Sequence, residues 1–309
     1  MSRIKAIVKK ICTLARIYSM QDGWRSYTRY GDDKWQLAGF NKKESWRDMF
    51  CADPFLFRHD GCNWLFYETV LKRSRKGVLG CLGEVDGKWV QQGKVLEQPW
   101  HLSYPQVFEE DGRIYMIPEE SDRGRGSVNL YVATDFPRGW VKRATLIDRP
   151  FCDSTLLKHD GHWYMACCPI TENGTAELWH ADFLLGPWKR HPQYMNINQS
   201  KRLRRCGGRF ITRDGKLYRV AQDCNGFYGK RLFMVPVLEI SPAAYREGEA
   251  HVLWDKSMPP YSYCHTYNEI DVEGKRLSVI DVHHDVIDSP QRIIAKVMHG
   301  FRKFIGNDG

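Results

Sequence analysis

Short apolar runs alternate with turn residues along most of this chain of 309 residues. The clearest case is residues 153–164, where an apolar run leads to Asp160-Gly161 and then to the aromatic stretch His-Trp-Tyr. Asp-Gly readily adopts the positive φ angles of a two-residue hairpin turn, so the pattern predicts a β-hairpin. The pattern occurs five times in all, with turn glycines at 61, 112, 161, 215 and 274, separated by 51, 49, 54 and 59 residues. The fifth copy is weaker, because Glu273 replaces the aspartate.

This spacing predicts an all-β protein, a five-bladed β-propeller. Repeats of about 40–50 residues that contain several short strands are typical of propellers. A second strand pair follows most of the hairpins, as at residues 128–133 and 176–181, so each repeat has room for four strands. The alternative is an unrelated series of hairpins in a β-sandwich, although sandwiches seldom repeat their turn chemistry at near-constant spacing. Residues 22–48 are expected to add a strand that helps to close the last blade.

The two ends of the chain have helical periodicity instead. Residues 1–21 and 289–309 each place apolar residues at i, i+3, i+4 and i+7, with basic residues on the other face. Ser289-Pro290 is a good helix start. We therefore expect a short basic amphipathic helix at each terminus, flanking a propeller at 22–288. Such helices bind anionic membrane surfaces, or they pack on the propeller or on partner chains.

The net charge of +9 comes from these ends. Residues 1–20 carry five basic and no acidic residues, and residues 289–306 carry four basic and no acidic residues. The remaining 37 basic residues balance the 37 acidic residues. A near-neutral propeller disfavours nucleic acid as a partner.

Targeting and cysteine signals favour the cytoplasm. The N-terminus lacks the continuous apolar core of a signal peptide, and no apolar run reaches the length of a membrane span. The ten cysteines show no disulfide framework and no Cys-x-x-Cys pair. We expect a cytoplasmic protein, peripheral at the inner face of the membrane, and we predict no metal-binding cluster and no cofactor.

Candidate chemistry lies at the ends of the predicted inner strands. Their first positions, which point toward the channel of a propeller, are Asp53, Tyr104, Asp153, Gly207 and Tyr267. The following strands end in a second polar set, namely Glu68, Glu119, Glu120, Gln222, Asp223, Asp281, His283 and His284. Acids are costly to bury without partners, so apolar strands that end in acids indicate a polar cavity.

Paired carboxylates suit glycosyl transfer, in which one stabilises or attacks the oxocarbenium-like centre and another handles the leaving-group proton. The candidate catalytic residues are Asp53, Glu119, Asp153 and Asp223. The candidate substrate-binding residues are Glu68, His101, Tyr104, Arg205, Arg209, Gln222 and His265. The structural alternative is that the acids cap backbone amides or form salt bridges, and that His265 is a core histidine.

Several motifs together resemble a known family. They are Ala52-Asp-Pro-Phe-Leu-Phe57, Trp64-Leu-Phe-Tyr-Glu68, His101-Leu-Ser-Tyr-Pro105, Ile117-Pro-Glu119, Leu185-Gly-Pro-Trp188 and Ala221-Gln-Asp-Cys224. Residues 45–285 resemble the N-terminal domain of plant glucosamine inositolphosphorylceramide transferase and its bacterial relatives. That domain is similar to the five-bladed propellers of furanosidase-type glycoside hydrolases, such as arabinanases and β-xylosidases.

The resemblance implies roles for individual residues. In those hydrolases a blade-one Asp is the base or nucleophile, a blade-three Asp orients it, and a blade-four Glu is the acid. Asp53 and Asp153 match the first two by blade position. Blade four departs from the pattern, because it offers Asp223 and no obvious Glu, while Glu119 comes from blade two. The resemblance also implies that sugar transfer in the plant protein belongs to a separate C-terminal domain.

Three functional hypotheses follow. The first is a glycosyltransferase in surface polysaccharide or glycolipid synthesis, which would use a sugar nucleotide and a lipid-linked acceptor. The second is a glycoside hydrolase that uses the same residues. The third is a non-catalytic glycan-binding module that assists a partner transferase.

Overall fold

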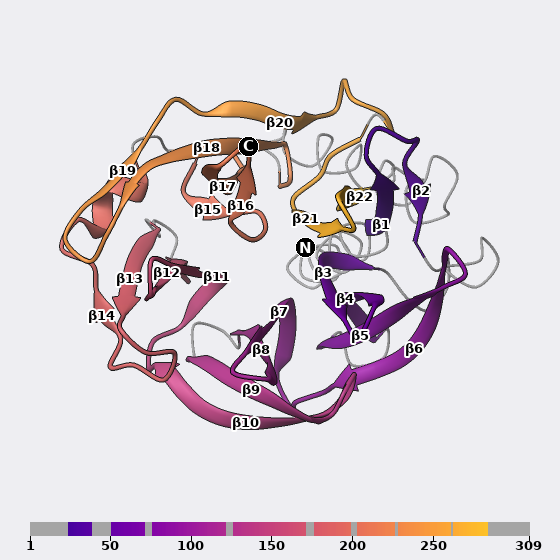
Figure 1. Ribbon diagram of the computed structural model, residues 1–309, viewed down its shortest axis with the longest axis horizontal. Helices are drawn as coiled ribbons and strands as arrows, with labels where there is room; N and C mark the ends of the chain where they lie inside the picture. The colour runs from indigo at the N-terminus through magenta and orange to yellow at the C-terminus, as the bar shows by residue number, and fades with distance from the viewer. Residues whose placement is uncertain are drawn as a thin grey trace, which may run out of the picture.

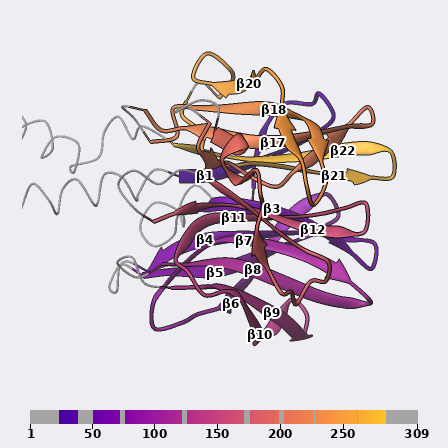
Figure 2. The same ribbon diagram turned by 90° about the vertical axis from the view of Figure 1, so that its left-hand side faces the viewer.

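The computed structural model describes residues 24–38, 51–71, 76–121, 126–170, 176–198, 203–225, 228–260 and 262–283. These residues form five antiparallel sheets arranged as blades around a central channel (Figure 1). The predicted all-β, five-bladed propeller is confirmed. Seen from the side, the strands of each blade run through the thickness of the ring (Figure 2).

Blades one to three have four strands each. Blade one contains β3 (Ala52–His59), β4 (Cys62–Leu71), β5 (Lys76–Val85) and β6 (Lys88–Leu96). Blade two contains β7 (His101–Glu110), β8 (Arg113–Ser121), β9 (Val128–Asp135) and β10 (Arg138–Ile147). Blade three contains β11 (Phe151–His159), β12 (His162–Pro169), β13 (Glu177–Ala181) and β14 (Lys189–Arg190).

Blades four and five are less regular. The 3₁₀ helix η1 (Tyr194–Asn198) precedes blade four. Blade four contains β15 (Arg205–Cys206), β16 (Ile211–Arg213), β17 (Lys216–Asp223), β18 (Arg231–Ile240), β19 (Tyr245–Glu247) and β20 (His251–Asp255). Blade five contains β21 (Tyr267–Val272), β22 (Lys275–His283), β1 (Trp24–Tyr30) and β2 (Gln36–Leu37).

The ring closes through blade five, as the sequence predicts. Strand β1, from the start of the described chain, pairs with β22, from its end, in a register that runs from Trp24 opposite His283 to Tyr30 opposite Leu277. The predicted helices at 1–21 and 289–309 lie outside the described residues. Within the described residues, no helix has the length and apolarity needed to cross a membrane.

The five predicted hairpin turns are present, and all lie on one face of the ring. At Asp160-Gly161 the φ angles are 47° and 79°, the left-handed conformation that the Asp-Gly pair predicts. The weaker fifth turn uses Glu273-Gly274, with φ angles of 55° and 79°. The inner strands β3, β7, β11 and β21 start on the opposite face, which we call the site face.

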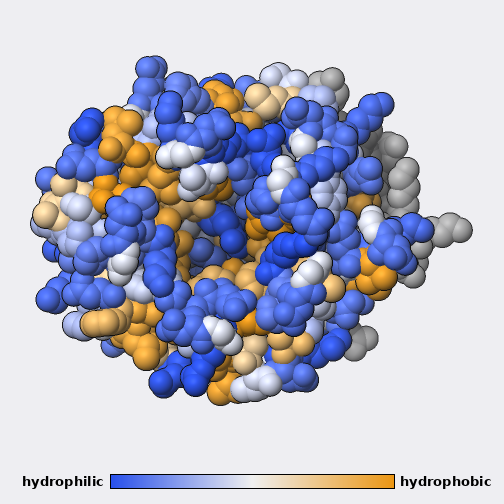
Figure 3. All heavy atoms as spheres, viewed as in Figure 1, coloured by the Kyte–Doolittle hydropathy of each residue, from blue (hydrophilic) through white to orange (hydrophobic). Residues whose placement is uncertain are grey.

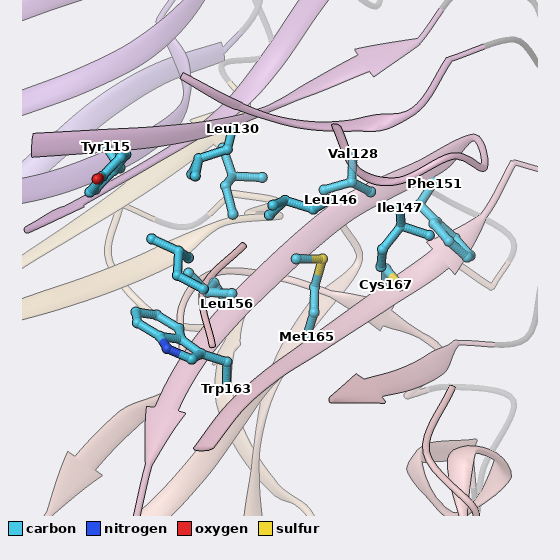
Figure 4. Packing of buried hydrophobic residues seen from close by; sticks show 12 residues of the cluster. Tyr115, Val128, Leu130, Leu146, Ile147, Phe151, Leu156, Trp163, Met165 and Cys167 are labelled. Atoms are coloured by element: carbon cyan, nitrogen blue, oxygen red, sulfur yellow. The ribbon is translucent and has the colours of Figure 1, made fainter. Parts of the chain in front are cut away.

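Apolar side chains fill the spaces between neighbouring blades. Between blades two and three, Leu130 and Ile147 of one blade face Leu156, Trp163 and Met165 of the other (Figure 4). Each fully buried large apolar side chain contributes about 1.5–3 kcal/mol relative to exposure. The blades therefore stabilise one another along their broad faces, which leaves the channel lining available for polar residues.

The inner strands share a distortion at their site-face ends. Asp53, Tyr104 and Asp153 have φ angles of 47°, 50° and 50°, and the pairing register of each strand shifts at that point. Non-glycine residues rarely adopt this conformation, and a tyrosine there is a true outlier. In blade four the distortion breaks the inner strand into β15 and β16 at Gly208, where a Cβ atom would lie 1.8 Å from Tyr267 O.

Candidate functional site

The distorted residues form the rim of a polar cluster on the site face. The backbone amides of two of them each donate a hydrogen bond to a carboxylate of the preceding blade. The amide of Asp53 donates to Asp281 Oδ2 at 3.0 Å, and the amide of Asp153 donates to Glu119 Oε2 at 3.0 Å. Glu119 therefore has the structural role that was the alternative to catalysis, because it caps a backbone amide and positions Asp153. The side chains of Asp53 and Asp153 have other partners.

Asp53 belongs to a buried chain of titratable groups that extends into blade five. Its Oδ1 atom accepts a hydrogen bond from Thr266 Oγ1 at 2.8 Å and lies 3.3 Å from His265 Nε2. His265 Nδ1 in turn lies 2.6 Å from Asp281 Oδ2. Asp281 is fully buried, and its Oδ1 accepts the amides of His265 and Thr266 at 3.1 and 2.8 Å. The imidazole is thus held between two carboxylates.

The surroundings raise the pKa values of both Asp53 and His265. Burial raises the pKa of Asp53 to about 7, and the carboxylates of Glu68, Asp281 and Asp153 add to the rise, while His265 opposes it. Burial alone would lower the pKa of His265, but Asp281 and Asp53 outweigh it and raise that pKa to about 9. Asp53 can therefore give or take a proton near neutral pH.

Asp53, His265 and Asp281 also offer ligand atoms within 4.8 Å of one another, so they could hold a metal ion. The sequence analysis predicted no such cluster, because these residues lie far apart along the chain. Two ligand atoms on one tetrahedral zinc ion would stand about 3.3 Å apart, given bonds of about 2.0–2.1 Å. The contact of 2.6 Å between His265 Nδ1 and Asp281 Oδ2 is shorter than this, so these two atoms do not have the spacing of two ligands on one zinc ion.

Asp153 has different partners from Asp53. Arg205 contacts both of its carboxylate oxygens, through Nε to Oδ2 and through Nη2 to Oδ1 at 3.3 Å. Gln222 Nε2 lies 3.3 Å from the same Oδ2 atom. Asp153 is 3% exposed, and a forked contact with a guanidinium fixes the orientation of a buried carboxylate as well as pairing its charge. Asp153 lies close enough to Asp53 to raise its pKa.

Other predicted residues line the edge of this cluster. His101 Nε2 lies 3.1 Å from Glu68 Oε1, and His101 Nδ1 accepts the amide of Gly77 at 3.0 Å. Asp223 is 1% exposed, and its Oδ1 atom accepts the amide of Asn225 at 2.9 Å. Its Oδ2 atom has no hydrogen-bond partner among the described residues.

Tyr104 and Arg209 have structural contacts that argue against the predicted ligand roles. Tyr104 is 1% exposed, and its hydroxyl bonds to Thr155 Oγ1 at 2.9 Å and accepts the amide of Gly208 at 2.7 Å. Arg209 Nη2 donates to Leu56 O at 2.8 Å. Burial lowers the pKa of Arg209 to about 10.

These two side chains tie blades across the channel. Tyr104 connects blade two to blades three and four, and Arg209 connects blade four to blade one and, through Val107 O at 3.3 Å, to blade two. They therefore block the channel beneath the polar cluster. The mouth on the hairpin-turn face, a hollow with hydrophilic side chains in it, is seen in Figure 3.

Two aromatic residues complete the cluster, and the sequence analysis did not include them. The Trp24 ring lies 4.1 Å from that of His265, and the Tyr228 ring lies 4.9 Å from it. The Arg205 guanidinium lies 5.3 Å from the centre of the Tyr228 ring. Trp24 precedes the repeats and Tyr228 follows a strand end, so neither stands at a repeated position that the sequence could reveal.

The arrangement can carry out acid–base chemistry beside a fixed negative charge. The structure brings together Asp53, Asp153, Arg205, Gln222 and His265. The contacts of the other three predicted residues, Glu119, Tyr104 and Arg209, are structural. A buried carboxyl group with a raised pKa in a polar cluster is characteristic of acid–base catalysts, although structural networks also produce such shifts. The predicted assignment of these residues to catalysis and binding stays a prediction.

Comparison with known proteins agrees with the motifs. The sequence model of the family described as "Glucosamine inositolphosphorylceramide transferase 1, N-terminal" matches residues 38–284. Glucosamine inositolphosphorylceramide transferase 1 of Arabidopsis thaliana is 32% identical over 261 residues, which cover 74% of this chain and 34% of that protein. The protein of the same name from Oryza sativa subsp. japonica is 36% identical over 206 residues, 64% of this chain and 27% of that one. The chain thus spans about a third or less of these relatives.

Solved structures share the fold at low sequence identity. Zg3597, a family 117 glycoside hydrolase of Zobellia galactanivorans, superposes with a TM-score of 0.57 at 12% identity, over 86% of this chain and 93% of that one. A xylan β-1,4-xylosidase of Bacillus halodurans C-125 gives a TM-score of 0.54 at 16% identity, over 74% and 55%. At these identities the likeness concerns the fold alone.

Proposed function

The chain belongs to the family of the N-terminal domain of glucosamine inositolphosphorylceramide transferase 1, and from this premise we propose that it is a carbohydrate-active glycosyltransferase. It would act in surface polysaccharide or glycolipid synthesis at the cytoplasmic face of the membrane. A sugar nucleotide is the proposed donor and a lipid-linked glycan the proposed acceptor. The basic residues of both termini support the membrane part of this proposal.

One observation carries the proposal: two buried carboxyl groups near one another have different partners, and one of them has a strongly raised pKa. The pKa of Asp53 is raised to about 7, whereas Asp153 is paired with Arg205 in a forked contact. A structural carboxylate is usually paired so that it stays ionised. Asp53 has Thr266 and His265 as partners and still has a pKa of about 7, so it can exchange a proton with a bound substrate near neutral pH.

The proposed reaction follows from these features. Asp53, in its ionised form, accepts the proton of the acceptor hydroxyl as that oxygen attacks the anomeric carbon of the donor. The bond from the anomeric carbon to the leaving phosphate breaks, and the phosphate departs without needing a proton. Asp153 stabilises the positive charge that develops on the sugar ring, and Arg205 holds its carboxylate in place. The proton on Asp53 passes to solvent after the products leave, and the positive charge of His265 beside it favours the return of Asp53 to its ionised form.

Hydrolysis is the second candidate, because of Asp223. This acid stands in blade four, where the resemblance to furanosidase-type hydrolases implies the general acid, and its Oδ2 atom lacks a hydrogen-bond partner among the described residues. Water would then replace the acceptor hydroxyl. A glycan-binding module without catalysis is the remaining possibility, and the experiment below separates all three.

The test incubates the purified chain with nucleotide sugars, with and without a membrane-lipid extract. We expect nucleotide release that depends on the extract and falls at least a hundredfold in Asp53→Asn and Asp153→Asn. Asp214→Asn is the matched control, since Asp214 is exposed in a hairpin turn and shares the positive φ, at 50°. Free sugar released from glycosides without a nucleotide would favour the hydrolase. Saturable glycan binding without turnover, unchanged in Asp53→Asn, would favour the binding module.

A further inference from the structure

A second pocket, separate from the polar cluster, opens between blades four and five. It has a volume of about 800 Å³. The residues that matter for its chemistry are Arg29, Lys34, Trp35, Arg213, Trp254 and Arg276. A cavity of this size accommodates a small organic molecule.

The pocket lies toward the hairpin-turn face. Arg213 is paired with Lys216 across the turn that joins β16 to β17, and Arg276 follows the turn that joins β21 to β22. The polar cluster around Asp53 lies at the other ends of the strands. A ligand in this pocket would therefore not contact the proposed catalytic residues.

Basic groups outnumber acidic groups around the pocket. Arg213 is neutralised by Glu269, which its Nε atom approaches at 2.9 Å, and Arg276 Nε lies 4.0 Å from the same carboxylate. Among the described residues, the other acid that Arg276 reaches is Asp32, at 3.7 Å, whose side chain is 96% exposed. Glu269 thus serves two arginines, and a long, exposed ion pair is left to compensate the second positive charge.

Arg29 adds another positive charge to the pocket. It makes no ion pair with any carboxylate among the described residues, and its guanidinium lies 4.5 Å from the centre of the Trp35 ring. The neighbouring acid, Asp33, lies 3.6 Å from Lys275. Stacking on an aromatic ring leaves the edge of a guanidinium free to donate hydrogen bonds to a ligand.

Two buried donors in this pocket have no acceptor. Arg29 Nε and Arg276 Nε are both buried, and neither has a hydrogen-bond partner among the described residues. Buried N–H groups are normally satisfied, so two orphaned donors on the same pocket call for an acceptor from outside the chain. An oxyanion supplies both the lone pairs and the missing negative charge.

Part of the lining of the pocket is apolar. Met234, Trp254 and Met258 line it, and the Trp254 ring packs edge-on against Trp35 at 5.9 Å. This apolar lining suits the organic part of a ligand rather than a bare inorganic ion. A phosphate monoester fits the two arginine charges better than a carboxylate, because it carries up to two negative charges on three oxygens.

We propose that this pocket is a binding site for a phosphorylated small molecule. The phosphate contacts Arg29, Arg276 and the exposed Lys34, and the organic part lies against Met234 and Trp254. The site is independent of the proposed transferase activity, since it shares no residue with it.

Isothermal titration calorimetry on the full chain tests this, with uridine 5′-monophosphate, glucose 6-phosphate, glucuronate and glucose as probes. We expect at least one of the phosphorylated probes to bind, and Arg29→Gln to weaken that binding at least tenfold. Asp53→Asn should leave it unchanged. Arg246→Gln is the control for loss of a basic residue, because Arg246 lies outside the pocket and its side chain is 59% exposed.

Three results would overturn the proposal: no binding of either phosphorylated probe at millimolar concentration, equal binding of glucose, or equal affinity of wild type and Arg29→Gln. A fourth contrary result is preferential binding of glucuronate, which would show that the pocket prefers a carboxylate to a phosphate. If Arg29→Gln does not fold, Lys34→Gln gives the second measurement, because Lys34 is exposed and its loss removes charge without disturbing Trp35. A fivefold loss is then expected, and no loss counts against the site.

Discussion

Asp53 and His265 bind their protons as a coupled pair, so the titration of one depends on the other. Both pKa values are higher in the folded chain than in the unfolded chain, about 7 against 3.8 for Asp53 and about 9 against 6.5 for His265. The folded state therefore holds more protons than the unfolded state through this range. Its stability must fall as protons are removed from solution.

We expect the free energy of unfolding to decrease from pH 5 to pH 9, by roughly 2–4 kcal/mol. The contribution of His265 is fully present below pH 6.5 and is lost as the pH rises through 9. Urea denaturation at pH 5, 7 and 9 measures this. His265→Gln should flatten the fall above pH 6.5, whereas His251→Gln, at an exposed position, should not. A wild-type stability that rises steadily over this range would contradict the assignment.

Sequence alone could find Asp53 and Asp153 because both stand at a repeated position, the start of an inner strand. It could not find what distinguishes them. The amide of Asp53 is bound by Asp281, 228 residues away, and no local pattern records such a contact. For the same reason it assigned Tyr104 to a ligand, when the ring is buried and its hydroxyl ties three blades together.

At the level of elements, the turns were predictable from the sequence, and strand β1 decides whether the ring closes. Turns of this kind depend on local conformation, so all five, four with Asp-Gly and one with Glu273-Gly274, could be located from the residues alone. The distortion of the inner strands depends on carboxylates of neighbouring blades and has no local signature. Strand β1 lies between β22 and β2, so its backbone bonds on both sides hold blade five together.

We expect Thr28→Pro in β1 to destabilise the chain by about 3 kcal/mol or more, because proline removes a ladder hydrogen bond inside a sheet. Thr28 stands opposite Val279 in β22 and Gln36 in β2. Thr28→Val is the matched control. It keeps the strand but removes the hydroxyl that accepts Trp89 Nε1 at 3.0 Å, and should cost about 1 kcal/mol. Equal urea midpoints for the two variants would show that β1 does not close the ring.

At the level of the whole molecule, the propeller is complete without its basic termini. The described strands already close the ring from Trp24 to His283, and the surplus charge of the sequence lies outside them. Folding and membrane attachment should therefore be separable properties of the chain.

We expect deletion of residues 1–21 and 289–309 to leave the far-UV circular dichroism spectrum and the melting temperature nearly unchanged. Binding to phosphatidylglycerol vesicles should fall at least tenfold, because the nine basic residues and the apolar stripes of both segments are removed. Sedimentation with vesicles measures it, and phosphatidylcholine vesicles give the baseline. Unchanged binding to anionic vesicles would exclude the termini as the membrane-binding segments.

The pairing of Trp24 with His283 has one more consequence. The two ends of the ring lie side by side, so the place at which the chain is cut is not dictated by the fold. A circular permutant that joins these ends through a short linker and opens at Asp160-Gly161 would retain every contact between blades. Its new termini would emerge on the hairpin-turn face. If those ends were attached to a surface, the polar cluster on the site face would point away from that surface.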